Sequence, residues 1–292
     1  SDLEFAKTWL PETQPARSIP AKSAAHSYLA LVHLTMGNYQ RAYDEAKGVI
    51  DNEVTYDLGL ELDFQDLFDA TKIDGSKEPI FALDFIGASN GDDGRDFNAA
   101  LTGIRSDEQY GIGGGWSVAV PSLAVYNSWD DRDYRKAVSF DATGVFGGNV
   151  EPYTIFRNFN SRAVNRPHIA KYTRHTGKTS TGNGRGSEQN YSMIRYAEVL
   201  LIAAEALNEI SPGSAEAHNY VNRVRSRARS GNGSGFPSDV SGLSQADFRT
   251  MVLEERKWEL AFEYKRWYDI ARRRLGPEVF GSSGLEGSKP GF

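Results

Sequence analysis

Apolar residues recur at helical spacing in three separate parts of the chain. Between residues 21 and 50 they fall three and four apart, and Gly37 and Asn38 divide them into two runs. This is the spacing at which one face of an α-helix repeats. The segment therefore predicts a helical hairpin, and Gly-Asn-Tyr between two helices of small and large residues resembles a tetratricopeptide unit. An ordinary antiparallel helix pair is the alternative.

A second hairpin is predicted over residues 194–228, with the break at Ser211, Pro212 and Gly213. Ser211 and Pro212 are the candidate start of its second helix. A third helical stretch runs from about 244 to 274, where Ser244 is a candidate N-cap. Isolated repeats cannot bury both of their faces, so these pairs are expected to pack on other parts of the chain. The pattern as a whole predicts a mostly α-helical fold.

The region between the hairpins, residues 52–190, has little periodicity. Its short apolar pieces at 79–85 and 117–126 could form strands or short helices, and glycine-rich segments surround them. Irregular stretches of this length inside a compact domain are usually functional surfaces. We therefore expect a ligand-binding region in 52–190, with specificity set by the loops 86–118 and 144–190.

Composition narrows the function classes. A chain of 292 residues fits one large domain or two small ones, and without cysteine it has neither disulfides nor thiolate chemistry. The net charge of −6 argues against nucleic acid as a partner, because proteins that bind phosphate backbones present a basic face. No apolar run approaches the length needed to cross a membrane, and no signal peptide is visible.

Two common catalytic and cofactor motifs are absent. The sequence contains no HExxH and no phosphate-binding GxxxxGK[ST], and we expect no catalytic residue, no metal and no cofactor. Asn90, Asp92, Asp93 and Asp96 form an acidic cluster, which we interpret as a solvated turn, with a calcium site as the alternative.

Three glutamates, Glu255, Glu259 and Glu263, fall at i, i+4 and i+8 on the third helical stretch. A glycosidase needs two carboxylates on opposite sides of a cleft. A stripe on one helix, interleaved with Arg256 and Arg266, is instead typical of ion pairs that fix packing. We expect these residues to be structural.

Three blocks of sequence carry a specific resemblance. The segments 194–207, 220–228 and 254–273 are similar, in this order, to the C-terminal signature of the SusD/RagB family. The matching residues are Arg195, Tyr196, Ala197 and Glu198, then Asn222, Val224, Arg225, Arg227 and Ala228, then Glu255, Arg256, Glu259, Leu260, Glu263, Arg266 and Asp269. The hairpin at 21–50 also resembles the family's middle repeat unit.

The resemblance implies a fold, a location and partners. It implies one SusD-like domain over residues 1–292, an α superhelix of tetratricopeptide-like hairpins with a loop-rich region. Family members are lipid-anchored at the outer membrane of Bacteroidetes and exposed at the cell surface. They capture oligosaccharides or polysaccharides for a TonB-dependent, SusC-like transporter, and they are not enzymes. The chain begins near the middle of longer members, so we expect their N-terminal part and lipid anchor to be lacking here.

A glycan site requires exposed aromatic faces and planar hydrogen-bonding groups. Trp116, directly after three glycines, is the first candidate, and Trp258 and Trp267 are expected in the core instead. The other candidate ligand-binding residues are Tyr110, Asn90, Asp92, Asp93 and Arg95, with a second group of Tyr153, Arg157 and Asn158.

Two other function classes stay open. A tetratricopeptide-type scaffold would bind a protein or peptide in a helical groove, and a carbohydrate-active enzyme would hydrolyse its polysaccharide. The signature blocks favour glycan binding over both.

Overall fold

The chain folds into two compact units, each assembled from distant segments. The computed structural model describes residues 2–87, 95–106, 114–156, 164–177 and 186–281. The first unit comprises Ser1–Phe64, Gly75–Leu83 and Ser192–Arg273, and the second comprises Gln65–Asp74, Asp84–Tyr191 and Arg274–Phe292. The interpretation of the chain as one domain stays a prediction.

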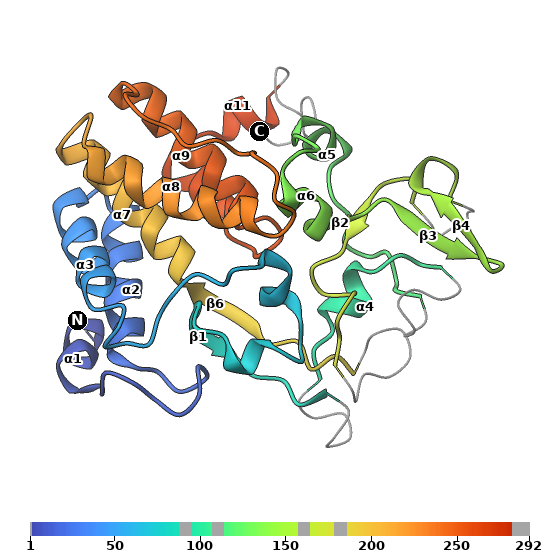
Figure 1. Cartoon of the computed structure of the whole chain (residues 1–292), viewed down its shortest axis with the longest axis horizontal. Coiled ribbons are helices and arrows are strands. Elements are labelled where there is room, and N and C mark those ends of the chain that lie inside the picture. The colour runs from blue at the N-terminus through green and yellow to red at the C-terminus, as the bar shows by residue number, and fades with distance from the viewer. Residues whose placement is uncertain (1, 88–94, 107–113, 157–163, 178–185, 282–292) are drawn as a thin grey trace. The chain divides into compact units, whose positions relative to one another are not determined.

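The first unit is mostly helical, as the apolar spacing predicts. Its helices are α1 (Asp2–Trp9), α2 (Lys22–Thr35), α3 (Tyr39–Asp51), α7 (Tyr196–Ile210), α8 (Ala215–Ser230), α9 (Gln245–Glu259) and α10 (Arg266–Arg272). Strands β1 (Pro79–Leu83) and β6 (Tyr191–Arg195) pair in a two-stranded sheet. In Figure 1, α2 packs against α3, and α7 packs against α3, α8 and α9.

Helix α7 forms the centre of this unit. Every residue from Tyr196 to Asn208 is buried, so the helix has no solvent-facing stripe. Small residues allow its neighbours to approach closely: Ala42 and Ala46 on α3 are fully buried in the same apolar cluster. The cluster joins both predicted hairpins, because neither could bury its apolar face alone.

The hairpins occupy the predicted segments, with one change at a helix start. Helices α2 and α3 lie within 21–51, and the turn between them contains Gly37 at φ +75. Helix α8 starts after Ser214, whose side chain accepts a hydrogen bond from the backbone N–H of Ala217 (3.4 Å). The predicted start at Ser211 and Pro212 therefore lies in the turn before the helix. Ser244 caps α9, as predicted, by accepting from the N–H of Asp247.

The prediction of one continuous helical stretch over 244–274 is wrong. Helix α9 ends at Glu259 and α10 begins at Arg266, and between them Phe262 and Tyr264 have φ +65 and +58. In a continuous helix the carbonyl of Glu259 would accept from residue 263. Here the guanidinium of Arg195 donates to that carbonyl oxygen (2.6 Å), and the N–H of Glu263 donates to the carbonyl oxygen of Leu260 instead.

The second unit contains short elements joined by irregular segments. They are η1 (Phe64–Phe68), η2 (Ile73–Gly75), α4 (Asn98–Thr102), α5 (Leu123–Ser128), α6 (Tyr134–Ser139), β2 (Phe140–Asp141), β3 (Thr143–Phe146), β4 (Asn149–Pro152), η4 (Tyr153–Ile155), β5 (His168–Ile169) and α11 (Gly276–Phe280). Strands β2 and β5 pair antiparallel, as do β3 and β4. Ile104, Phe146 and Phe156 form a small apolar core.

Within the described residues, none of the helices is both long and apolar enough to cross a membrane.

Candidate ligand-binding surface

The segment that carries Trp116 is hydrogen-bonded along its backbone to the end of α4. Trp116 N–H donates to Ala100 (2.7 Å), and Ser117 N–H donates to Gly103 (3.0 Å). Gly115 and Val118 make similar bonds to Ile104 and Leu101. The last carbonyls of a helix lack partners within the helix, and this segment satisfies those of α4. The position of Trp116 is therefore set by regular backbone pairing.

The glycines before Trp116 permit a close backbone approach. A Cβ on Gly115 would lie 2.4 Å from the backbone of Gly103, and one on Gly114 would lie 2.0 Å from the carbonyl oxygen of Ser106. A larger residue at either position would force the two segments apart. The glycine run thus has a packing role beside that of presenting the tryptophan.

Trp116 is half-buried and lies beside other apolar side chains at the surface. The ring of Phe97 is 6.4 Å away, centroid to centroid, at an interplanar angle of 46°. Phe97 is 43% exposed, and Val118, two residues after Trp116, is 66% exposed. We call Phe97, Trp116 and Val118 the aromatic surface. Phe97 and Val118 were not predicted from the sequence, because nothing in their immediate neighbours marks them as exposed.

Beneath the aromatic surface, Ser117 and the buried His168 are hydrogen-bonded. The Ser117 Oγ lies 2.8 Å from His168 Nε2 and accepts from the N–H of Arg105 (2.9 Å). His168 Nδ1 lies 2.9 Å from the carbonyl oxygen of Arg166. Burial lowers the pKa of His168 to about 4, so the ring is neutral at neutral pH.

Of the predicted acidic cluster, Asp96 lies within the described residues, and it is buried. Its Oδ1 accepts from the N–H of Asn98 at the start of α4 (2.9 Å). Burial raises its pKa to about 6, although the hydrogen bonds from Asn98 and Phe97 oppose that change. The interpretation of Asp96 as part of a solvated turn is therefore wrong, because its side chain is buried beside the first turn of α4.

The remaining candidates divide into described and undescribed residues. Arg95 is half-buried, and Tyr153 is half-buried with its ring edge-on to Tyr126 (5.8 Å, 74°). Tyr153 also packs on the core of Phe156, so much of its ring serves packing. Six candidates lie outside the described residues: Tyr110, Asn90, Asp92, Asp93, Arg157 and Asn158. Among the described residues, no cluster of three or more acids and histidines is arranged to hold a metal ion.

The signature residues of the first unit form buried ion pairs. Arg195 binds Glu78 (2.7 Å), Glu259 (2.5 Å) and Glu263 (2.8 Å), and Arg227 also binds Glu78 and Glu259. Burial alone would lower the pKa of Arg195, but the three carboxylates raise it well above the usual value. This cluster joins segments from four parts of the chain.

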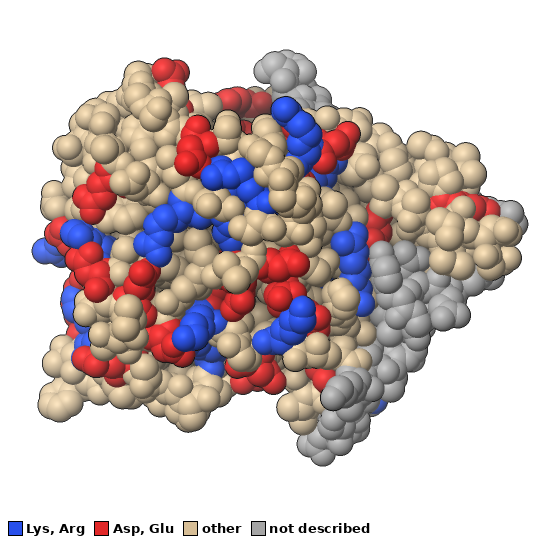
Figure 2. Space-filling view, in the orientation of Figure 1, with Lys and Arg blue, Asp and Glu red and all other residues tan. Residues whose placement is uncertain are grey.

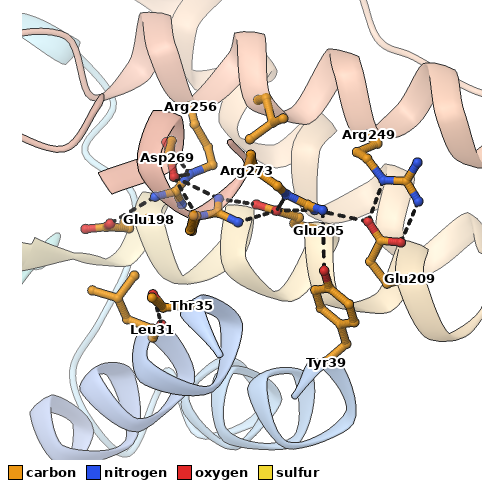
Figure 3. A network of polar contacts seen from close by, with 12 residues as sticks. Leu31, Thr35, Tyr39, Glu198, Glu205, Glu209, Arg249, Arg256, Asp269 and Arg273 are labelled. Atoms are coloured by element: carbon orange, nitrogen blue, oxygen red, sulfur yellow. Dashed lines mark hydrogen bonds and ion pairs between the residues drawn. The ribbon is translucent and has the colours of Figure 1, made fainter. Parts of the chain in front are cut away.

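A second row of charges follows α7 (Figure 3). Glu198, Glu205 and Glu209 project from α7 toward basic side chains of α9, of α10 and of the residue that follows α10. The pairs are Glu198 with Arg256 and Lys265, Glu205 with Arg272 and Arg273, Glu209 with Arg249 and Arg273, and Asp269 with Arg256 and Arg272. Burial alone would raise the pKa of Glu205, but the neighbouring Arg272 and Arg273 lower it, and the net result is a pKa below the usual value.

Two other signature residues, Glu255 and Arg266, also make contacts within the first unit. Glu255 binds Arg225 of α8 (2.8 Å), and Arg266 donates to the carbonyl of Leu253 (3.1 Å). Glu263 lies beyond the end of α9, so the three glutamates do not form a stripe on one helix. Trp267 is 54% exposed, and the expectation that it lies in the core is wrong.

Charges of both signs are interspersed on the face seen in Figure 2. Where charged residues gather on this face, Lys and Arg lie beside Asp and Glu, in keeping with the many ion pairs. A mixed surface of this kind differs from the basic stripe typical of proteins that bind nucleic acid.

Comparisons with known proteins identify the family. The model of the SusD family matches residues 149–283. SusD-like protein P2 of Formosa agariphila is 56% identical over 295 residues, which cover 100% of this chain and 58% of that protein. SusD-like protein P25 of the same organism is 27% identical, over 93% of this chain and 54% of its own length.

Solved structures share the fold. A SusD homolog from Bacteroides thetaiotaomicron has a TM-score of 0.78 at 24% identity, covering 94% of this chain and 58% of that one. Surface glycan-binding protein A from Bacteroides uniformis has a TM-score of 0.67 at 21% identity, covering 88% of this chain and 50% of that one. The fold is thus that of the mostly helical, tetratricopeptide-like SusD proteins.

The chain belongs to the SusD family. It spans a little over half the length of the curated relatives that it matches, 58% of P2 and 54% of P25.

Proposed function

We propose that this protein binds an oligosaccharide or polysaccharide at the bacterial cell surface and delivers it to a TonB-dependent, SusC-like transporter of the outer membrane. Membership of the SusD family supports the proposal, as does the fold shared with surface glycan-binding proteins of Bacteroides uniformis and Bacteroides thetaiotaomicron. In this proposal a lipid anchor of the whole protein provides the membrane attachment.

The observation that carries the proposal is the aromatic surface. Sugar rings present C–H patches that pack against aromatic faces, and Trp116 and Phe97 offer two neighbouring rings at the surface. The backbone bonds to α4 hold Trp116 in place before a ligand arrives, which reduces the entropy lost on binding. Arg95 and Tyr153 remain candidates for hydrogen bonds to sugar hydroxyls.

The proposed function includes no catalysis. A glycosidase needs two accessible carboxylates. Glu255, Glu259 and Glu263 are buried and held by arginines, so a polysaccharide cannot reach them without disrupting the first unit. Burial and ion pairing thus fit the expectation that these three glutamates are structural.

The test is native affinity electrophoresis through gels cast with starch, laminarin, xylan, mannan or pectin. We expect one glycan to retard the wild type, with retardation lost in Trp116→Ala and weakened in Phe97→Ala. Trp9→Ala is the matched control, because Trp9 is also an exposed tryptophan but lies on α1 in the first unit. Equal retardation of wild type and Trp116→Ala would refute the assignment of the aromatic surface. Release of reducing ends from the retarding glycan would refute the absence of catalysis.

A second candidate function, a protein-binding scaffold, is favoured by one observation in the first unit. Tyr264, Trp267 and Tyr268 are all exposed within five residues. Exposed aromatic residues are enriched at protein interfaces. If no glycan retards the wild type, co-purification with the transporter, compared between wild type and Trp267→Ala, tests this alternative.

A further inference from the structure

Ser117, the residue directly after Trp116, has a backbone conformation that serine rarely adopts. Its φ is +50, in the left-handed region that favours glycine. Left alone, Ser117 would relax to a negative φ, which turns the peptide plane that it shares with Trp116. Something in the fold must therefore keep Ser117 in this conformation.

The backbone bonds of this segment to α4 supply part of that restraint, and the hydrogen bonds of the Ser117 hydroxyl add to it. The Arg166 carbonyl oxygen can only accept, so His168 Nδ1 carries the ring proton and donates to it (2.9 Å). His168 Nε2 is then an acceptor, and the Ser117 hydroxyl donates to it (2.8 Å). The same Oγ accepts from Arg105 N–H (2.9 Å), so donors and acceptors along this chain are matched.

His168 is a firm anchor for this chain of bonds. It lies on β5, which pairs with β2 so that His168 is opposite Asp141. Its ring is fully buried, 5.9 Å from the ring of Phe156 in the small apolar core. A displacement of Ser117 would leave a buried ring nitrogen without a partner, which is unfavourable.

We propose that Ser117 and His168 are positioning residues that hold Trp116 in its orientation beside Phe97 for ligand binding. This proposal rests on the proposed function of the aromatic surface. Neither residue touches the ligand: His168 acts through Ser117, and Ser117 acts through the backbone of Trp116. Ser117 and His168 are 51 residues apart in the sequence, and the β2–β5 pairing holds His168 in place. Through the bond between the two residues, this pairing determines the orientation of the tryptophan that contacts the ligand.

The experiment compares variants in glycan affinity and in the collisional quenching of Trp116 fluorescence by acrylamide. The Trp116 signal is obtained as the difference between each variant and the same variant carrying Trp116→Phe. Ser117→Ala removes the hydroxyl, and His168→Phe keeps a ring of similar size without nitrogen. We expect each to raise the Kd for the retarding glycan about tenfold, the scale of one buried hydrogen bond with its partner left unsatisfied. Quenching of Trp116 should change in both.

Three further variants separate positioning from general stability. The double variant should bind about as well as either single one, because both changes break the same bond. His168→Gln, whose side-chain oxygen can accept from Ser117, should restore most of the affinity. Ser122→Ala is the matched control, since it removes a serine cap of α5 in the same unit (Val125 N–H to Oγ, 3.3 Å) and should leave Kd and Trp116 quenching unchanged.

The results distinguish the two proposals. If Trp116→Ala abolishes binding but Ser117→Ala and His168→Phe leave Kd and quenching unchanged, the positioning role is overturned while the aromatic surface stands. If Trp116→Ala binds like wild type, the proposed site fails; the quenching change in Ser117→Ala then still decides whether Ser117 orients Trp116. Additive losses in the double variant would also overturn the proposal, because they would show independent effects.

Discussion

Two buried titratable groups of the second unit, Asp96 and His168, should impose opposite dependences of stability on pH. Burial raises the pKa of Asp96 from 3.8 to about 6. Its contribution to stability is therefore fully present below pH 3.8 and is lost as the pH rises through 6. Burial lowers the pKa of His168 from 6.5 to about 4. Its contribution is present above pH 6.5 and is lost as the pH falls through 4.

The two effects are of similar size. At 1.36 kcal/mol for each tenfold change in proton affinity, each amounts to about 3 kcal/mol. In the wild type they largely cancel between pH 4 and 6.5, so these two groups leave stability nearly level there. Asp96→Asn removes one of them while keeping an oxygen that can accept from the N–H of Asn98. The variant should therefore lose about 3 kcal/mol of stability between pH 6.5 and pH 4, because the histidine is protonated in the unfolded chain while His168 stays neutral in the folded protein.

The assay is urea unfolding at pH 4, 5, 6, 7 and 8, with the difference between variant and wild type as the measured quantity. That difference excludes the titration of all other groups, and it should favour the variant most at pH 7–8 and shrink toward pH 4. Asp130→Asn is the control: Asp130 is exposed, and the hydrogen bonds from Arg132 hold its pKa at about 2, so no change is expected over this range. A difference for Asp96→Asn that is constant from pH 4 to 8 would refute the reasoning.

Three further predictions concern the ion pairs, the glycines and the helix break. Arg195→Met should destabilise the protein by about 3–5 kcal/mol, because Glu78, Glu259 and Glu263 would each lose a buried guanidinium partner. Arg132→Met, at an exposed pair, should change the melting temperature little. Gly115→Ala should destabilise the second unit and weaken glycan binding, because its Cβ would meet the backbone of Gly103 at 2.4 Å. Gly276→Ala, with open space around it, should be near neutral in both stability and glycan binding. Tyr264→Gly should stabilise the protein by about 1 kcal/mol in chemical unfolding, since glycine adopts the positive φ between α9 and α10 without the cost that a side chain incurs; a loss of more than 1 kcal/mol would show that the tyrosine ring contributes more than the backbone strain removes.

Several features were predictable from local sequence because they depend on neighbours along the chain. The apolar spacing of 21–50 predicted α2 and α3, and the Ser244 cap followed from its place before a helical run. The motif residues Arg195, Glu259 and Glu263 were recognised from their order. Their contacts were not, because a motif does not reveal that Glu78, the residue before β1 and more than 100 residues earlier than Arg195, completes the cluster.

The candidate site was predictable only in part. Trp116 was found because a tryptophan after three glycines is unusual. The packing reason for two of these glycines, the close approach of Gly115 to Gly103 and of Gly114 to Ser106, was not predicted. Phe97, Ser117 and His168 carried no local signal. His168 in particular is one of five histidines, and what distinguishes it is its burial between Arg166 and Ser117.

The sequence by itself determined the helical hairpins, the family signature and the absence of cysteine chemistry, since these depend on composition and short-range spacing. Only the tertiary structure decided where the third helical stretch breaks. Arg195, 64 residues earlier in the chain, donates to the carbonyl oxygen of Glu259, which would otherwise accept the next hydrogen bond of the helix. The tertiary structure also decided that Asp96 is buried and that Ser117 has a positive φ. For the helix break and for Ser117 a partner distant in the chain outweighs the local preference, and such partners meet only when the chain is folded.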